Sequence, residues 1–240
     1  AGTVMFMFQP GEEGHHGCRF MLEDGLIDPL PDAAFAIHIT PSMPSGTFAS
    51  KPGTLMASSD KLRIRVIGRG GHASMPHDAL DPIPIACEIV TALQTAMTRR
   101  IGVVDPAVVT IARIEGGTTD NIIPEDCRLW GTLRTLSERA RNKAHAVIQE
   151  VAQGIAAAHG AQVDCQIETG FPVTVNDGRA VALASRTAKT LFGEGGWRDM
   201  PGPMMGAEDF SYLLQKVPGV MTFLGAVPEG GDYHTCCALH

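Results

Sequence analysis

The stretch KLRIRV, residues 61–66, decides the fold of the middle of the chain. Apolar Leu62, Ile64 and Val66 alternate strictly with the basic residues at positions 61, 63 and 65. Because successive side chains of a strand point to opposite faces of a sheet, this alternation predicts a strand with one buried face and one wet face. Such strands are typical of antiparallel sheets that pack on helices through a single face.

Helical and strand patterns follow this strand in a regular order. The periodicity predicts a helix from about residue 81 to 99, and Ser137 is an N-cap candidate for a second, clearly amphipathic helix. Further strands are predicted at residues 107–114, 125–135 and 162–168. The order strand, helix, strand, strand, helix, strand across residues 58–168 is that of a ferredoxin-like α+β unit.

The sequence on either side of this unit has the pattern of an α/β layer. Short apolar runs at Val4–Phe8 and residues 33–37 predict strands buried on both faces, with a helix between them at residues 16–26. Beyond residue 170 the patterns predict helices at 179–192 and 208–215 and a buried strand at 220–224. We therefore predict a layered α/β domain of residues 1–57 and 169–240, interrupted by an α+β domain of residues 58–168.

Composition narrows the class of protein. The 240 residues are 44% hydrophobic and 19% charged, which is the composition of a globular protein with a real core. The net charge is −7 and no basic cluster occurs, so neither nucleic acid nor a membrane is an expected partner. The six cysteines lack the spacing of a zinc finger or of a disulfide framework. A cytoplasmic protein with reduced thiols is expected.

Both ends of the sequence have the pattern of interrupted structure. The chain begins directly with the strand-like AGTVMFMF, without an initiator methionine or a signal-peptide pattern, and it stops shortly after a glycine-rich turn. The sequence therefore predicts a fragment of a longer protein.

The turn FQPGEEGHHG, residues 8–17, places Glu12 and Glu13 side by side after the first predicted strand. The plainest interpretation is a solvated acidic first helical turn, which the helix dipole favours. If Glu13 instead binds a metal ion, the charge of its carboxylate is neutralised. Glu12 then lies beside water that the metal ion activates, within reach of the proton that a general base removes. A glycosidase-type pair is excluded, because its carboxyl groups face each other across a substrate at about 5–9 Å.

Two histidines follow other predicted strands of the same layer. His38 ends the predicted strand at residues 33–37, and His240 follows the last predicted strand. Ligands of α/β sheets bind beyond the carboxyl ends of the strands, and carboxylate and imidazole together suit zinc, manganese or cobalt. A single histidine at a strand end is more often structural. The Glu12–Glu13 turn, His38 and His240 give three candidate ligand positions at one edge of the sheet, and this favours a metal site.

Five blocks of the sequence carry a resemblance to a known family: FQPGEEG, AIHITPSMPSG, GRGGHASMPH, GGTTDNIIPEDCRLWGTLRT and MGAEDFSYLL. They are similar, in this order, to the co-catalytic metal aminoacylase and carboxypeptidase family. The branch they resemble contains hippurate hydrolases, N-acyl-amino-acid amidohydrolases and auxin-conjugate hydrolases. The likeness covers nearly the whole chain.

The resemblance implies a role for each matching residue. Glu12 would be the general base, and Glu13, His38 and His240 would be ligands of two divalent metal ions per site, zinc, manganese or cobalt. The inserted domain would form a homodimer, and His72 would reach the active site of the partner subunit. Asn121 would contact the substrate carboxylate or acyl oxygen, and Arg134 would support that carboxylate. Pairing of two copies of the inserted domain is also expected, because its first strand, with Lys61, Arg63 and Arg65, is predicted to be an exposed edge of the sheet.

Some positions depart from the family pattern. The family's upstream Cys-x-His block and the Asp that follows it are not found in this sequence, so two ligands are missing from it. His15 and His16 replace small residues, either as a helix start or as adventitious metal binders. His234, Cys236 and Cys237 lie close to His240 and are possible substitute ligands only by proximity.

These patterns together predict a metal-dependent amidohydrolase that cleaves N-acyl amino acids, such as hippurate or N-acetyl amino acids, with metal-activated water and Glu12 as the base. Two alternatives stay open. One is a catalytically inactive dimerisation or ligand-binding fragment, and the other is a dipeptidase or carboxypeptidase that uses the same site. The 240 residues alone are expected to be inactive and to hold metal poorly, because catalytic zinc takes three protein ligands and two ions need more.

Overall fold

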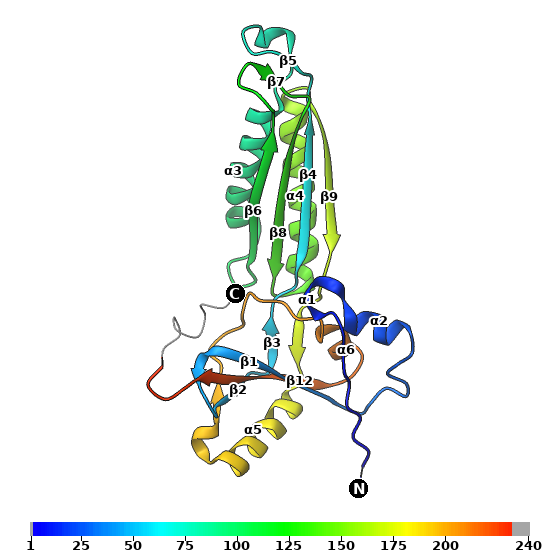
Figure 1. Cartoon of the computed structure of the whole chain (residues 1–240), viewed down its shortest axis with the longest axis vertical. Helices are drawn as coiled ribbons and strands as arrows, with labels where there is room; N and C mark the ends of the chain where they lie inside the picture. Colours follow the sequence, from blue (N-terminus) through cyan, green and yellow to red (C-terminus); the bar gives the residue numbers. More distant parts are fainter. Residues whose placement is uncertain (1, 232–240) are drawn as a thin grey trace. The chain divides into compact units, whose positions relative to one another are not determined.

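The computed structural model describes residues 2–231 (Figure 1). It divides into two compact units: unit 1 contains Ala1–Ala57 and Phe171–His240, and unit 2 contains Ser58–Gly170. Unit 1 is thus built from two separate segments of the chain, and unit 2 lies between them in the sequence.

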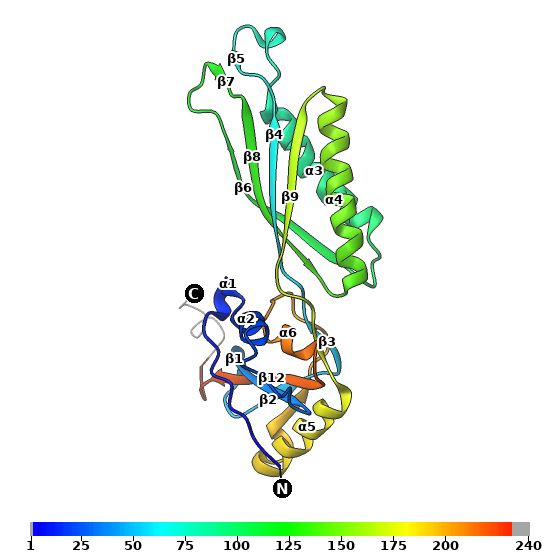
Figure 2. The ribbon, with the colours of Figure 1, turned by 90° about the vertical axis from the view of Figure 1, so that its right-hand side faces the viewer.

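Unit 2 is a four-stranded antiparallel sheet with two helices. Its elements follow the chain as β4 (Asp60–Ile67), α3 (Pro82–Arg100), β6 (Ala107–Gly116), β8 (Asp126–Thr135), α4 (Glu138–Ala158) and β9 (Gln162–Thr169). The strands lie in the order β6-β8-β4-β9, and every neighbouring pair is antiparallel. Figure 2 shows both helices on the same face of this sheet.

The alternation in β4 produces the predicted half-buried strand. Leu62, Ile64 and Val66 are buried and form one core with apolar residues of α3 and α4, while the basic side chains between them are exposed. The helices begin where their caps predict, since Asp81 accepts a hydrogen bond from Ile83 N at 3.0 Å and Ser137 accepts one from Ala140 N at 3.0 Å.

The expectation that this strand is an exposed edge is wrong. β4 lies between β8 and β9, so only its outward side chains are exposed, and the edges of the sheet are β6 and β9. Alternation of apolar and polar residues predicts which face of a strand is exposed to solvent, but it does not predict the position of the strand within its sheet.

A small two-stranded sheet forms one end of unit 2. β5 (Gly71–His72) pairs antiparallel with β7 (Ile122–Ile123), and a short 3-10 helix, η1 (Pro76–Asp78), follows β5. Figure 1 shows this sheet beyond the end of β4.

Unit 1 contains a mixed sheet with helices on both faces. Its strands lie in the order β1 (Ala34–Pro44), β12 (Gly219–Val227), β2 (Phe48–Ser50) and β11 (Trp197–Asp199), and a separate sheet pairs β10 (Thr174–Asn176) with β3 (Gly53–Met56). Helix α5 (Gly178–Phe192), followed by η2 (Glu194–Gly196), covers one face, while α2 (Gly17–Glu23) and α6 (Ser211–Leu214) lie over the other (Figures 1 and 2).

The prediction of a buried strand at Val4–Phe8 is wrong. These residues form no strand, and the side chains of Val4, Phe6 and Phe8 are 75%, 78% and 87% exposed. An apolar run becomes a strand only where another strand supplies hydrogen bonds, and no described strand lies along this one. The burial predicted for residues 33–37 also fails in part, because Phe35 and Ile37 on the edge strand β1 are exposed.

Two further sequence expectations concern the whole chain. None of the helices within residues 2–231 combines the length and the apolar character that a membrane span needs. Cys18, Cys87, Cys127 and Cys165 are free thiols, while Cys236 and Cys237 lie outside the described residues.

Candidate active site

The turn from Pro10 to Gly17 carries Glu12 and Glu13 in unit 1. Residues 12–15 form the short helix α1 (Glu12–His15), but Glu13 has ψ 74° and the segment is not a regular helix. Gly11 opens the turn with φ 65°, which L side chains rarely adopt. Gly17 N donates to the Gly11 carbonyl at 3.3 Å, and a Cβ atom on Gly17 would lie 1.7 Å from the Pro10 carbonyl oxygen. The two glycines therefore allow a tight loop around the carboxylates.

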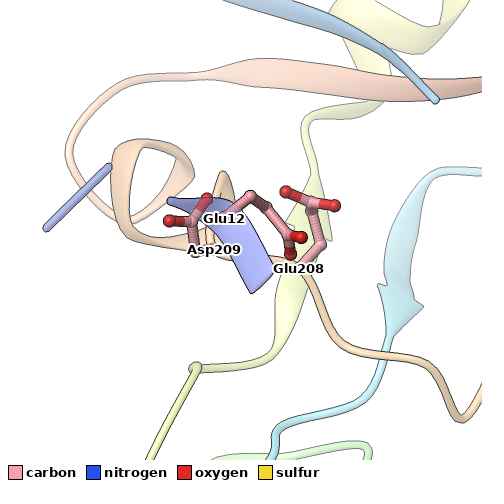
Figure 3. A group of neighbouring side chains, drawn as sticks. All are labelled: Glu12, Glu208 and Asp209. Atoms are coloured by element: carbon pink, nitrogen blue, oxygen red, sulfur yellow. The ribbon is translucent and has the colours of Figure 1, made fainter. Parts of the chain in front are cut away.

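The structure brings Glu12 together with Glu208 and Asp209. Ligand atoms of these three carboxylates lie within 4.8 Å of one another, and Figure 3 shows the Glu12 side chain extending toward Glu208. Glu208 and Asp209 are buried and belong to the segment that leads into α6. Sequence reasoning missed both, although they lie in MGAEDFSYLL, one of the five blocks that carry the family resemblance.

Burial and like charges act on the protonation of this cluster. Burial, followed by the charges of Asp209 and Glu13, raises the pKa of Glu12. Burial and the charge of Glu12 raise the pKa of Glu208 to about 7. Two carboxylates near each other with raised pKa values are typical of functional sites, because structural carboxylates are normally paired with cations.

His38 lies close enough to act on the same carboxylates, since it lowers the pKa of both Glu12 and Glu208. It does not end its strand as predicted: β1 continues to Pro44, and His38 pairs with Phe223 within the parallel ladder. Its Nδ1 lies 2.5 Å from the Ile39 carbonyl oxygen. Because a carbonyl only accepts, Nδ1 carries the proton of the neutral ring, and Nε2 keeps its lone pair for a metal ion.

The donors around Glu12 fit a divalent metal ion. Glu13 is exposed on the same turn, and His38 offers an imidazole nitrogen with a fixed tautomer. The carboxylates of Glu12, Glu208 and Asp209 are close enough together to hold a metal ion. Carboxylate oxygen with imidazole nitrogen is the donor set of zinc, manganese and cobalt sites. His240 lies outside the described residues, as do His234, Cys236 and Cys237, so their predicted roles stay predictions.

Of the two histidines that depart from the family pattern, His16 has a structural position. It is the residue before α2, and its Nδ1 lies 2.9 Å from the Tyr212 hydroxyl. This contact fits the expected helix start. His15 is exposed at the end of α1.

His72 and Asn121 lie together at one end of unit 2. The Ala73 backbone N–H donates to the Asn121 carbonyl at 3.0 Å, and both side chains are exposed. The Ser74 backbone N–H donates to His72 Nδ1 at 3.1 Å. Because a backbone N–H only donates, His72 Nδ1 is an acceptor, and the neutral ring presents Nε2–H as a hydrogen-bond donor. His72 and His38 thus present opposite functions at Nε2.

Arg134 lies at the other end of unit 2, in the four-stranded sheet. It pairs with Val108 near the last residues of β8, beside the point where the chain leaves unit 1 for unit 2. Burial lowers the pKa of the Arg134 guanidinium, and the charge of Asp60 acts in the opposite direction. No carboxylate of residues 2–231 is within ion-pair distance of this half-buried cation, which makes it a candidate anion-binding group.

Unit 2 therefore separates the predicted substrate residues into two groups. β4 has 8 residues between the end near Arg134 and the end near His72. At the rise of a strand this corresponds to about 25 Å, which is longer than an N-acyl amino acid. His72 and Arg134 of the same unit 2 cannot contact one such molecule together.

Comparison with known proteins gives a family match over nearly the whole chain. Residues 1–236 match the model of peptidase family M20/M25/M40. Thermostable carboxypeptidase 2 of Saccharolobus solfataricus is 38% identical over 236 residues, which are 95% of this chain and 58% of the relative. N-acetylcysteine deacetylase of Bacillus subtilis is also 38% identical, over 225 residues, with 93% and 58% covered. The chain thus spans 58% of the length of these two curated relatives.

Solved structures give the same result. The YXEP protein of Bacillus subtilis, described as a dinuclear metal-binding peptidase from the M20 family, has a TM-score of 0.73 at 34% identity. The match covers 91% of this chain and 54% of that one. A structure from methicillin-resistant Staphylococcus aureus, described as an aminohydrolase, has a TM-score of 0.84 at 28% identity and covers 93% and 57%. The chain belongs to peptidase family M20/M25/M40.

Proposed function

We propose that the protein containing this chain is a metal-dependent amidohydrolase that removes an acyl group from N-acyl amino acids. The observation that carries the proposal is the position of Glu12: its carboxyl is partly buried, faces Glu208 and lies within electrostatic range of His38. Relatives named N-acetylcysteine deacetylase and N-acetyldiaminopimelate deacetylase support the substrate class.

Glu12 acts as the general base in this proposal. A base works best when its pKa lies near the working pH, and burial with the charges of Asp209 and Glu13 moves the pKa of Glu12 upward in that direction. Glu12 takes a proton from the attacking water and later delivers it to the leaving amine. The tight turn at Gly11 and Gly17 keeps its carboxylate in one place between these two steps.

Glu13 and His38 would hold a divalent ion, with His240 as a further ligand. Such an ion, when bound, polarises the scissile carbonyl and lowers the pKa of water. Zinc, manganese and cobalt all suit this donor set, and the YXEP relative is described as dinuclear. The hydrogen bond from His38 Nδ1 to the Ile39 carbonyl orients the ring for this role.

Arg134, His72 and Asn121 would bind the substrate in two groups. Arg134 suits the amino-acid carboxylate, because a guanidinium binds a carboxylate through two parallel hydrogen bonds. His72 presents an N–H at Nε2, which suits the oxygen of the scissile carbonyl. The length of β4 keeps these groups apart within one chain, so a site that uses both takes His72 from a second chain.

Unit 2 is accordingly proposed to be a ferredoxin-like dimerisation domain. Its sheet order β6-β8-β4-β9 leaves β6 and β9 as edges that can pair with another copy. Sedimentation of residues 58–170 at micromolar concentration tests this proposal. A homodimer is expected, and a monomeric mass would count against the composite site.

The activity is tested with a substrate panel on a full-length protein that contains this chain. Hippurate, N-acetyl amino acids and dipeptides are compared with and without a chelator, and hydrolysis that the chelator abolishes is expected. Glu12→Gln should lower turnover by about 10² to 10⁴ while metal content stays, because the base is removed and the size kept. Glu13→Gln should instead lower metal content. If Glu12→Gln loses metal while Glu13→Gln keeps both metal and rate, the two roles are reversed.

A second candidate function is a peptidase with the same site. The relative named thermostable carboxypeptidase 2 is as similar to this chain as the deacetylase relative is, at 38% identity. Preference for dipeptides over N-acyl amino acids in the same panel would favour it. Loss of all hydrolysis, with no change of native mass on chelation, would favour an inactive ligand-binding protein.

A further inference from the structure

Both carboxylate oxygens of Asp209 accept hydrogen bonds from the segment that carries Glu12. Oδ1 accepts from Gln9 Nε2 at 2.5 Å, and Oδ2 accepts from the backbone N–H of Cys18 at 3.0 Å. Asp209 is 0% exposed. A buried carboxylate is tolerated only where donors satisfy it, and here both donors come from a distant part of the chain.

These two donors lie at opposite ends of the turn. Gln9 precedes the turn and Cys18 follows it, while the hydrogen bond from Gly17 N to Gly11 O closes the loop between them. The carboxylate oxygens of Asp209 and Glu12 also lie within 4.8 Å of each other. One residue therefore holds both ends of the loop that carries Glu12.

The start of helix α2 explains why a negative charge is stabilised at this position. Cys18 is in the first turn of α2, where backbone N–H groups lack partners within the helix. The N-cap residue of α2, His16, provides no side-chain hydrogen bond to them. Asp209 supplies that cap from another segment, in the field of the helix N-terminus. Each of its two oxygens thus accepts one hydrogen bond, from Gln9 or from the start of α2.

We propose that Asp209 is a positioning residue that holds the Glu12 carboxylate at the reacting centre by fixing the turn at Gln9 and Cys18. The inference rests on the function proposed above, because it assigns Glu12 the work of the base. It separates the three clustered carboxylates by role: Glu12 reacts, Glu208 faces it, and Asp209 sets its position.

Two substitutions at this position separate hydrogen bonding from charge. In Asp209→Asn the amide oxygen can accept from Cys18 N–H, and the Gln9 amide can flip to accept from the new NH₂ group, so both contacts survive without the charge. In Asp209→Ala both contacts are lost. Gln9→Ala removes one contact only and leaves the buried carboxylate bonded to Cys18.

The experiment measures kcat, KM, metal content and amide exchange of residues 11–18 in the full-length protein. Asp209→Ala is expected to lower kcat per bound metal ion by about 10- to 100-fold with KM little changed, since displacement of a catalytic group by about 1 Å can cost 10². Asp209→Asn should recover most of that loss, and its exchange should resemble the wild type. Gln9→Ala should fall between them.

Asp177→Ala is the matched control. Asp177 is also a carboxylate at a helix start in unit 1, where it accepts hydrogen bonds from Arg179 N at 2.8 Å and Ala180 N at 3.2 Å, and it does not contact the turn. It should lower the melting temperature and leave kcat unchanged. A merely structural role of Asp209 would give the same result for both alanine variants.

Several outcomes would overturn the proposal. Retention of kcat in Asp209→Ala would do so, and so would an Asp209→Asn variant as slow as the alanine variant. Loss of metal in Asp209→Asn would make Asp209 a ligand. If Asp209→Ala does not fold, unchanged kcat in Gln9→Ala decides against positioning. A wild-type protein without hydrolysis would refute the proposed function itself, and unchanged amide exchange in the variants would refute the turn contact separately.

Discussion

Each unit buries a carboxylate, but the two carboxylates have opposite surroundings. Asp60 in unit 2 is 0% exposed and Glu208 in unit 1 is 8% exposed. Hydrogen bonds from His145, Arg141 and the Gly170 amide outweigh the effect of burial and hold the pKa of Asp60 below its ordinary range. Around Glu208, burial and the charge of Glu12 act in the same direction and raise the pKa to about 7.

The different partners of Asp60 and Glu208 indicate a structural role for the first carboxylate and a functional role for the second. Asp60 joins β4 to α4 and to the point where the chain leaves unit 2, through Arg141 and Gly170. A carboxylate with this many donors is a structural element. Glu208 is surrounded by other carboxylates and has no ion pair among the described residues, which is costly for the apoprotein and useful to a site that binds cations or moves protons.

The hydrophobic core of unit 2 is also more continuous than that of unit 1. Unit 2 has one continuous core, in which residues of the sheet meet residues of both helices. Unit 1 has two smaller clusters on opposite faces of its sheet, and its edge strand β1 leaves Phe35, Ile37 and Ile39 54%, 65% and 64% exposed. Unit 2 is therefore expected to be the more stable of the two.

The largest expected effect is on unit 2, from Asp60→Asn. The amide presents an NH₂ group to donors and leaves the buried Arg141 charge with only the exposed Glu138 as a partner, so unfolding should become easier by about 3–5 kcal/mol at pH 7. The chain has two tryptophans, Trp130 in unit 2 and Trp197 in unit 1. Urea unfolding followed by Trp130 fluorescence, in a Trp197→Phe background, reports on unit 2 alone.

The pH dependence of this effect has a definite sign. The folded-state pKa of Asp60 is lowered, so its contribution is present above the unfolded pKa, about 3.9, and is lost as pH falls below it. Asp126→Asn is the control, because Asp126 pairs with Arg65 and Arg128 on the wet face and should contribute about 1 kcal/mol or less. Equal losses for the two variants would refute the structural role assigned to Asp60.

Some features of the two units can be predicted from the sequence because they depend on local patterns, and others cannot. The alternation of Leu62, Ile64 and Val66 predicts β4 because burial on one face has a local period. The adjacent Glu12 and Glu13 predict a site because they share one turn. Strands of three or four residues, such as β2 and β11, are too short to show a period.

Other features depend on contacts between distant segments. Glu208 and Asp209 join the site only when their segment packs against the turn at Glu12, so no local spacing reveals them. The exposure of Val4 and Phe6 depends on whether another strand lies beside them, which an apolar run does not state. The opposite tautomers of His38 and His72 depend on Ile39 O and Ser74 N, and only coordinates show those contacts.

An intermediate effect of opposite sign is expected in unit 1, from Glu208→Gln. In metal-free protein at pH 8 this variant should be more stable than wild type by about 1–3 kcal/mol, because it removes a buried charge that repels Glu12. The folded-state pKa is raised, so the stability that Glu208 contributes is complete below its ordinary value of 4.5 and is lost as pH rises through about 7. The gain should therefore vanish at pH 4.

Trp197 fluorescence in a Trp130→Phe background measures this gain with a chelator present. Glu23→Gln is the control, since Glu23 is exposed on α2 with Arg19 as its partner, and it should change stability by less than about 0.5 kcal/mol. A Glu208→Gln variant that is less stable at pH 8 would mean that the Glu208 carboxylate is satisfied in the folded apoprotein.

The smallest expected effect tests the edge of unit 1 against the core of unit 2 with one type of substitution. Ile37→Thr on β1 should change the free energy of unfolding by less than about 0.5 kcal/mol, because the side chain is exposed and threonine suits a strand. Ile64→Thr on β4 should cost about 2–4 kcal/mol, because Ile64 is 1% exposed and the change buries a hydroxyl.

Ile37→Thr should nevertheless reduce the binding of an apolar dye and the aggregation of the 240-residue chain, since Ile37 lies between exposed Phe35 and Ile39 on an edge strand. Urea unfolding, dye fluorescence and light scattering check the three statements, and a cost for Ile37→Thr comparable to that of Ile64→Thr would show that β1 is covered in solution.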